Sequence, residues 1–567
     1  MVENTTSYIM IRSLSLLLAA LLGYSASAQN IFIDEDYADW SDAMLLMEDT
    51  NGDGPPNGID IGKVWAANDQ EYFYLRIEVG KDINIQSNNE LTLYIDADND
   101  LQTGRKINGI GAELEWIFGE RDGTLYLPNG DELFLQHEDI DLMSSPTVSS
   151  SQFEIAMRRS AFVAGFALDL DGTITIRLED NGTNGDDIPN SIGGMTYTLG
   201  STTRDFHNYD ISKPADTDLR VLTLNVLDDN LFDPLLFNAF RRQLALADPD
   251  VIALQEVRSF TSSETQSIIQ QMLPGQWFHN KSSFGNVVLL SRFPILQDEG
   301  MNGNEAHLID VNGQEVVVIN MHLPCCNNDV DRQQEVDNMM AFVRDLRTDA
   351  NEIRVATNTP IIILGDSNLV GNSQQQQTLL TGDIQNVSQH GPAFAPDWDG
   401  SELEDAKPLA TGTPYSKTWY NRSGSFSSGR LDYIIYTGSV LWLQNTFVIS
   451  TRDMTTADRN AYGVNFSDSQ IASDHLPTVA DFSFTSVSTV DTDIIDVQLY
   501  PNPVADVLTV TAAGKQLTDV VIYDPTGQTV LRASHGNNID VSALGSGVYT
   551  VSGMVGKTPV VRKFVKM

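Results

Sequence analysis

The sequence predicts a multidomain protein, with an N-terminal β-sandwich, a central α/β domain and a small C-terminal β-sandwich. The chain has 567 residues, which is too long for one ordinary domain. In its central part, 218–485, short β-branched runs each end in a polar residue, as the buried strands of α/β proteins do. The flanking regions, 29–200 and 494–567, contain short strand-like runs separated by turn residues.

The first 28 residues, 1–28, have the pattern of a secretory signal peptide. Arg12 precedes an apolar run over 14–22, and Ala26-Ser27-Ala28 supplies the small residues of a cleavage site. The apolar run is too short to span a membrane, and no other stretch of the sequence approaches about 18 apolar residues. We therefore expect an exported protein with no transmembrane segment.

The N-terminal region begins with an acidic phrase around Trp40, followed by strand-like runs over 72–79 and 91–96. These phrases resemble a family 9 carbohydrate-binding-module or DOMON-type β-sandwich. The resemblance implies a polysaccharide partner, with Trp40, Trp65 and Trp116 as a candidate stacking platform. Tryptophans in a β-sandwich also serve as core residues, which is the alternative for all three.

Two acidic loops of this region are candidate calcium sites. In each loop, oxygen-bearing side chains alternate along a tight turn, which is typical of calcium-binding loops. Pro55-Pro56 and the lack of flanking helices argue against an EF-hand, and solvated turns are the alternative. The candidate ligands are Asp49, Asn51, Asp53 and Asp60 in the first loop and Asp96, Asp98 and Asp100 in the second.

The central region places polar residues at or just past the ends of six apolar runs. In α/β folds these strand ends gather catalytic groups at one edge of a sheet. Carboxylates there can hold a divalent metal, and an imidazole can move a proton near neutral pH. In chain order the residues are Asn225, Glu256, His322, Asp366 with Asn368, Asp432, and Asp474 with His475.

Taken together, these phrases resemble the endonuclease/exonuclease/phosphatase superfamily, which has the deoxyribonuclease I-like fold. The resemblance covers about half the chain and implies an α/β two-sheet sandwich flanked by helices that hydrolyses phosphate esters. The phrases are LNV at 224–226, LQEV at 254–257, GNVVLLSRFP at 285–294, NMHL at 320–323, GDSN at 365–368, RLDYI at 430–434 and SDHLP at 473–477.

The resemblance implies a metal site. Glu256 matches the principal metal ligand, and Asn225 and Asp474 match further oxygen donors. Hard oxygen ligands suit Mg²⁺ or Mn²⁺, leave Ca²⁺ as an alternative and disfavour Zn²⁺.

The resemblance also implies roles around the scissile phosphate. Asp432 would orient His475, and His322 would donate a hydrogen bond to a phosphoryl oxygen. Asp366 would orient or deprotonate the attacking water, and Asn368 would hold substrate or metal. The general base is left open between Asp366 and His475.

Two local features depart from this pattern. Ser367 stands where the family more often has an aromatic residue, so the packing of that strand is expected to differ. Cys325 and Cys326, the chain's only cysteines, directly follow the His322 motif. Adjacent cysteines need a strained turn to form a disulfide, so we expect separate thiols. A bridge, if formed, would stiffen the loop that follows His322.

Charge bears on the substrate. The net charge is −43, which predicts a solvated acidic surface and long-range repulsion of polyanions such as nucleic acid. No cluster of Lys and Arg offsets this repulsion, and an inositol-phosphate phosphomonoesterase would be expected to show one. No exposed aromatic hairpin is evident in the sequence, which disfavours a membrane lipid.

The function predicted is an exported, divalent-metal-dependent phosphodiesterase acting on nucleic acid or on lipid headgroups, that is, a nuclease or a phospholipase C-like enzyme. The phosphomonoesterase is one alternative. Another is a non-catalytic surface binding or adhesion protein on an inactive phosphoesterase scaffold. The complete set of motif residues argues against an inactive scaffold.

The C-terminal region contains YPNP at 500–503, YDPTGQ at 523–528, SGVYTV at 546–551 and KFVK at 563–566. These phrases resemble the C-terminal sorting domain of the type IX secretion system of Bacteroidetes. The resemblance implies the type IX machinery as a partner and a secreted or cell-surface location. Polar stretches at 201–217 and 486–493 are predicted linkers.

Overall fold

The computed structural model describes residues 30–49, 52–56, 58–204, 206, 209–283, 285–348, 350–420, 426–484, 497–512, 517–524, 529–535, 538–555 and 558–567. The predicted signal peptide, Asn51 and the predicted linker 486–493 lie outside these residues. The chain divides into two compact units, Met1–Thr485 and Ser486–Met567.

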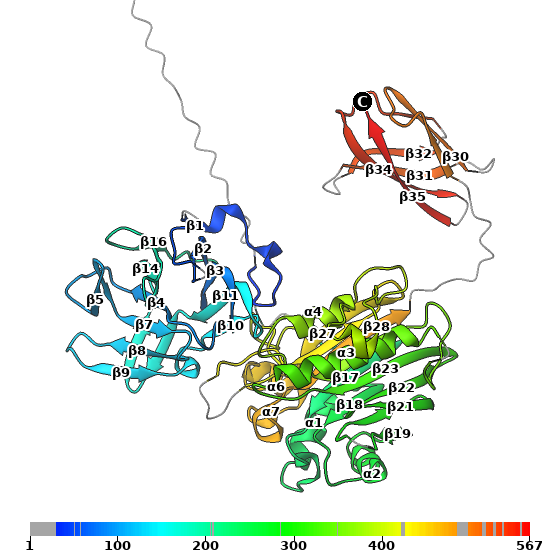
Figure 1. Ribbon diagram of the computed structural model, residues 1–567, viewed down its shortest axis with the longest axis horizontal. Helices are drawn as coiled ribbons and strands as arrows, with labels where there is room; N and C mark the ends of the chain where they lie inside the picture. The colour runs from blue at the N-terminus through cyan, green and yellow to red at the C-terminus, as the bar shows by residue number, and fades with distance from the viewer. Residues whose placement is uncertain are drawn as a thin grey trace, which may run out of the picture. The chain divides into compact units, whose positions relative to one another are not determined.

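The N-terminal part of the larger unit is built from antiparallel sheets (Figure 1), which confirms the predicted all-β region. One sheet has the order β1 (Leu45–Glu48), β2 (Lys63–Asn68), β3 (Tyr72–Ile83), β11 (Ser150–Arg158), β10 (Met143–Ser145). The other has the order β15 (Asp187–Ile188), β14 (Thr173–Asp180), β4 (Leu91–Asp96), β7 (Leu114–Ile117), β8 (Asp122–Tyr126), β9 (Glu132–Leu135), with β16 (Met195–Thr198) also on β14.

Short elements complete this region. They are the hairpins β5 (Arg105–Ile107) with β6 (Ile110–Ala112) and β12 (Ser160–Val163) with β13 (Phe166–Asp169), and the 3-10 helices η1 (Tyr37–Asp39), η2 (Asp42–Met44) and η3 (His137–Asp139). A single apolar core takes residues from both sheets, among them Leu75 and Leu93.

The predicted tryptophan platform is wrong. Trp40, Trp65 and Trp116 are only 7%, 6% and 2% exposed, so none of them offers a ring face to a sugar. Their large apolar surface is instead used to fill the interior.

The central domain packs two six-stranded sheets face to face, with helices on the outside (Figure 1). The first sheet has the order β19 (Phe278–Lys281), β20 (Val288–Ser291), β18 (Val251–Gln255), β17 (Leu219–Asn225), β28 (Thr478–Phe484), β27 (Leu441–Val448). The second has the order β21 (Ile295–Met301), β22 (Asn304–Val311), β23 (Gln314–His322), β24 (Ile361–Asp366), β26 (Asp432–Tyr436), β25 (Glu404–Asp405).

Three cores hold these layers together. Val221 and Val318 pack between the two sheets, whereas Leu222, one residue further along, packs against α1 and α2 on the outer face. The second sheet packs likewise against α3 and α4. Because both faces are buried, these strands read as continuous apolar runs. The helical elements are η4 (Asn230–Phe232), α1 (Phe237–Ala247), α2 (Ser262–Met272), α3 (Asp329–Asp345), α4 (Gln374–Thr381), α5 (Val387–His390), α6 (Thr456–Tyr462) and α7 (Asp468–Ala472).

A fully buried polar network joins the two sheets. Gln255 Nε2 on β18 donates to Thr223 Oγ1 on β17 at 3.1 Å and to Asn320 Oδ1 on β23 at 2.8 Å. Asn320 Nδ2 in turn donates to the carbonyls of Leu254 and Val288. Satisfied buried networks of this kind fix a unique alignment, because any slip would leave polar groups unpaired.

The N-terminal region is anchored to the central domain by buried contacts. Arg430, which is 1% exposed, donates to Glu35 Oε2 at 2.8 Å and to Asp405 Oδ2 at 2.6 Å. Thr147 Oγ1 donates to the carbonyl of Leu369 at 2.7 Å, and Ile33 forms a β-bridge with Tyr415.

The smaller unit also consists of antiparallel sheets. One has the order β29 (Val497–Tyr500), β30 (Val507–Ala512), β33 (Asn538–Asp540), and the other β32 (Thr529–His535), β31 (Leu517–Tyr523), β34 (Gly547–Val555), β35 (Thr558–Lys566). Their shared core includes Leu508, Ile522 and Phe564. In neither unit do the described residues include a helix with the length and hydropathy needed to cross a membrane.

The Arg430 anchor yields a stability prediction. Arg430→Met should lower the free energy of unfolding of the larger unit by about 3–5 kcal/mol, because Glu35 and Asp405 lose the partner of their buried charges. Calorimetry of the full chain measures the change. The control is Glu48→Gln, which removes the exposed ion pair with Lys63 and should cost less than about 0.5 kcal/mol. Equal small effects of the two variants would contradict the anchor.

Candidate active site

The predicted site residues of the central domain meet where the two sheets end on one side. β17, β23 and β24 end at Asn225, His322 and Asp366, whereas the antiparallel β26 begins at Asp432. Register alone brings several of them together, because His322 is opposite Asp366 and Asp366 is opposite Asp432. His475 lies three residues before β28 begins.

The Asp366 carboxylate is the centre of the cluster. Asn225 Nδ2 donates to Asp366 Oδ2 at 2.9 Å, and the Nε2 atoms of His322 and His475 lie 3.5 and 3.6 Å from the same oxygen. Asp366 Oδ1 accepts the backbone N–H of Asn368 at 3.1 Å. The carboxylate is 1% exposed, so these neighbours take the place of water around its charge.

The strand that carries Asp366 has two local features that its sequence requires. Gly365 has φ +143°, and a Cβ there would lie 2.0 Å from the carbonyl oxygen of Met321 on the neighbouring strand. Ser367, the departure noted in the sequence, is fully buried and donates its hydroxyl to the carbonyl of Leu431 at 2.7 Å. The different packing expected at Ser367 is therefore a hydrogen bond in place of an aromatic ring.

His475 and Asp432 form a buried pair. His475 Nδ1 lies 2.8 Å from Asp432 Oδ2, and Thr418 Oγ1 accepts the backbone N–H of Asp432 at 2.8 Å. Burial disfavours the charged imidazole, but the charges of Asp432 and Asp366 outweigh it and raise the pKa of His475 to about 10. In the metal-free protein His475 is therefore protonated at neutral pH.

His322 is held by residues to which the sequence did not give a role. Its Nδ1 lies 2.8 Å from Asn286 Oδ1, and its backbone N–H donates to Asn304 Oδ1 at 2.7 Å. Asn304 Nδ2 donates in turn to Glu335 Oε2 on α3. Asn286 belongs to the GNVVLLSRFP phrase, but Asn304 carries no signal in the sequence.

The metal-ligand candidates surround this cluster. Glu256 directly follows β18 in a left-handed conformation with φ +62°, and its Oε1 lies 3.9 Å from His322 Nε2. Asn225 Oδ1 accepts the backbone N–H of Leu227, so its oxygen already has one partner. Among the described residues, Asp474 Oδ2 accepts from Trp419 Nε1 at 3.2 Å, while Asp474 Oδ1 is buried without a hydrogen-bond partner.

These oxygens fit a hard divalent cation. A buried carboxylate oxygen without a donor is costly, and a cation would satisfy it. The Glu256 and Asp474 carboxylates and the Asn225 amide are of the ligand class that Mg²⁺ or Mn²⁺ prefers. Asn368 takes a different place, because its Nδ2 donates to the carbonyl of Leu323 and so joins the loop after β23 to the loop after β24.

The calcium candidates form two clusters in the N-terminal region. Asp49 and Asp53 group with Asp186, and Asp96 and Asp98 group with Glu113, with ligand atoms in each group within 4.8 Å of one another. The sequence pattern did not identify Asp186 or Glu113, because each comes from a different segment of the chain.

The other two acidic candidates in the described loops bind backbone instead. Asp60 accepts the N–H groups of Gly52 and Gly54, and Asp100 accepts the N–H of Gln102. Calcium binding by these loops stays a prediction.

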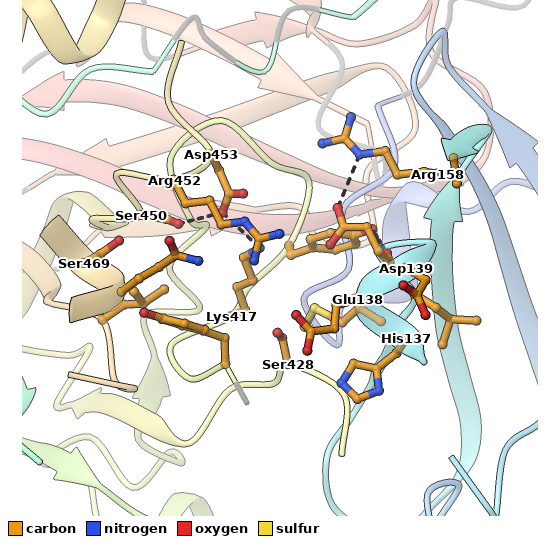
Figure 2. A pocket seen from close by; sticks show the side chains of 18 of the residues that line it. His137, Glu138, Asp139, Arg158, Lys417, Ser428, Ser450, Arg452, Asp453 and Ser469 are labelled. Carbon is orange, nitrogen blue, oxygen red and sulfur yellow. Dashed lines mark hydrogen bonds and ion pairs between the residues drawn. The ribbon is translucent and has the colours of Figure 1, made fainter. Parts of the chain in front are cut away.

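A polar cavity of about 370 Å³ lies between the N-terminal region and the central domain. Figure 2 shows Glu138 and Arg158 on its N-terminal side and Lys417, Arg452 and Asp453 on the central-domain side. Lys417 pairs with Asp453 at 3.0 Å, so part of the lining charge is neutralised internally. Leu476, next to His475, also lines this cavity.

Comparison with protein families gives two matches. Residues 222–475 match the endonuclease/exonuclease/phosphatase family, and residues 498–567 match the secretion system C-terminal sorting domain. The central part of the chain is therefore a domain of the first family, and the sorting domain indicates secretion or display at the cell surface. No curated protein matches the chain.

Solved structures similar to the chain include three with the following values. The human Nocturnin catalytic domain is 18% identical and has a TM-score of 0.30, covering 48% of this chain and 97% of its own. TDP2 from D. rerio, complexed with a single-strand DNA product, is 18% identical with a TM-score of 0.29, covering 47% and 98%. An endonuclease/exonuclease/phosphatase family protein from Leptotrichia buccalis is 18% identical with a TM-score of 0.32, covering 47% and 100%.

The buried pair yields a pH prediction. Asp432→Asn should lower the pKa of His475 from about 10, because the amide removes the nearest charge that raises it. NMR titration of the imidazole signals in EDTA-treated protein measures this pKa, with His475→Gln assigning the signal.

The same pair should make stability depend on pH. Since the imidazole pKa rises on folding from about 6.5, the pair's contribution to stability is fully present below pH 6.5 and is lost as pH rises through about 10. The Asp432→Asn variant should lose most of this dependence. An unchanged pKa of His475 in the variant would refute the assignment.

Proposed function

We propose that the central domain is a divalent-metal-dependent phosphodiesterase that works outside the cell. The observation that carries the proposal is the sharing of Asp366 Oδ2 by two imidazoles and the Asn225 amide. A buried carboxylate between two histidines can accept a proton from water while the imidazoles meet the oxygens of a phosphate.

The contacts favour Asp366 over His475 as the general base. The pKa of His475, raised to about 10, leaves its imidazole protonated at neutral pH and therefore unable to take a proton from water. A protonated His475 can instead donate to a phosphoryl or leaving oxygen. His322, on a neighbouring strand, is placed to donate to another phosphoryl oxygen.

A divalent cation, when bound, would neutralise phosphate charge in the transition state. Glu256 and Asp474 would hold it, with Asn225 as a further oxygen donor. The Asn225 amide also positions Asp366, so this residue would connect the ligand set with the proton acceptor.

The substrate class is narrowed by surface features. The net charge of −43 disfavours polyanions, which works against nucleic acid. The sequence gave no sign of an exposed aromatic hairpin, but that expectation is wrong. The β12–β13 hairpin presents Phe162 and Phe166, which are 75% and 43% exposed. This finding removes the argument against a lipid headgroup and favours a phospholipase C-like activity over a nuclease.

The complete constellation also bears on the inactive-scaffold alternative. A scaffold with no chemistry has no need to keep two imidazoles against one buried carboxylate, because each buried charge costs stability. An inositol-phosphate phosphomonoesterase would need free cations near the site. Arg258, beside Glu256, is instead paired with Asp228 at 3.0 Å.

The activity is tested with bis(p-nitrophenyl) phosphate as reporter. We expect hydrolysis with Mg²⁺ or Mn²⁺ and its loss in EDTA. Asp366→Asn and His475→Gln should each lower kcat about 100- to 10,000-fold, the usual contribution of a general acid or base. The exposed-loop variant Asp399→Asn is the control and should keep full activity. A rate that responds neither to EDTA nor to the two site variants would remove the phosphodiesterase proposal.

The substrate is tested with plasmid DNA, RNA, sphingomyelin vesicles and inositol phosphates. A nuclease would lose activity steeply as salt rises, because phosphate contacts release counterions. We expect preferential hydrolysis of the vesicle substrate instead. Phe162→Ser with Phe166→Ser should reduce vesicle hydrolysis but leave hydrolysis of the soluble reporter unchanged. Salt-sensitive cleavage of DNA without vesicle activity would identify a nuclease.

A further inference from the structure

The loop that follows His322 contains the chain's only two cysteines, and the proposed mechanism uses neither. The loop spans 323–328, between the end of β23 and the start of α3. Cys325 and Cys326 are both exposed free thiols, and their Sγ atoms lie 2.6 Å apart. Cys326 has φ +65°, a left-handed conformation that is rare for a residue with a side chain.

The backbone around the two thiols is held on all sides. Asn368 Nδ2 donates to the carbonyl of Leu323 at 2.9 Å, and Arg332, which is fully buried, donates to the carbonyl of Pro324 at 2.6 Å. Arg332 also reaches the carbonyl of Cys326 at 3.3 Å, and Asn328 Nδ2 donates to that of Cys325 at 2.9 Å. Four successive carbonyls therefore have donors, and the strained turn that brings the thiols together is imposed by the surrounding fold.

This loop is also part of the edge that carries the candidate active site. The backbone N–H of Leu323 donates to the carbonyl of Asp366 at 3.0 Å, and the Asn368 side chain closes the same contact from the other strand. Any change in the stiffness of the loop therefore reaches the two residues next to the proposed proton acceptor.

A role as nucleophile does not suit the pair. The hydrogen bond from the neighbouring thiol, together with burial, raises the pKa of Cys325 to about 11, so little thiolate exists at neutral pH. Oxidation is the chemistry that remains for two thiols held in contact, and the sorting domain indicates that the protein reaches an oxidising environment.

We propose that Cys325 and Cys326 are a modification site, where a disulfide between adjacent residues forms outside the cell and locks the rim of the active site. The oxidant is a protein or small-molecule disulfide. One cysteine sulfur attacks the oxidant and releases its first thiol, and the second cysteine then attacks the mixed disulfide and releases the other. Two cysteine thiols are oxidised, and one oxidant disulfide is reduced to two thiols.

The effect of this bridge should be local. Disulfide stabilisation in the chain-entropy model grows with the length of the closed loop, and a bridge between neighbours closes almost none. The midpoint of thermal unfolding should therefore shift by a few degrees at most. Hydrogen exchange of the 323–328 amides should slow, because the turn can no longer open.

The modification is tested by mass spectrometry of full-length protein purified from the medium without reductant. After denaturation with N-ethylmaleimide and digestion with trypsin, the peptide 293–332 should carry no label and be two hydrogens lighter than the dithiol. Prior reduction should give two labels, and a Cys325→Ser variant should give one. Two labels without reduction, or a disulfide-linked dimer on a non-reducing gel, would overturn the proposal.

The consequence for activity rests on the proposed phosphodiesterase function and is measured separately. Reductant should raise the KM of the reporter severalfold in the wild type, whereas the Cys325→Ser, Cys326→Ser double variant should not respond. An equal response in both proteins would show that the bridge does not act on the site. If no form hydrolyses the reporter, the phosphodiesterase proposal fails, while the mass measurement still decides the modification.

Discussion

The structure of the central domain depends on one buried carboxylate. Asp366 lies at the end of β24, almost without solvent, and a charge in such a place is unstable unless other groups replace water around it. The replacement comes from both sheets, with Asn225 from the first and His322 from the second. The two sheets must therefore end together, and His475 must approach from the segment before β28.

The layers below this edge are built to keep that alignment. The network of Thr223, Gln255 and Asn320 bridges the two sheets within an otherwise apolar core, and every member is fully buried. A slip of one sheet along the other would leave these groups unpaired, which costs more than the loss of apolar contacts of similar size. The network thus gives the edge a defined geometry that apolar packing alone would not specify.

The N-terminal region contributes to this edge, although nothing in its sequence indicates that it should. Its Glu35 pairs with Arg430, two residues before Asp432, and its Thr147 binds the carbonyl of Leu369 just past Asn368. A buried arginine between two carboxylates constrains both segments, because separating them would leave charges unpaired. In the described residues the region therefore serves as a support for the strand ends, whatever ligand it binds.

The sequence by itself determined the order of domains, the strand ends that carry Asn225, His322, Asp366, Asp432 and His475, and the secreted location. It could do so because buried strands, turn residues and the short phrases around them are local patterns. Only the tertiary structure decided that Asn286, Asn304 and Thr418 hold the site, that the tryptophans are core, that Phe162 and Phe166 are exposed and that Asp186 joins an acidic cluster. These facts depend on contacts between segments far apart in the chain, and such contacts leave no mark in the periodicity or spacing of either segment.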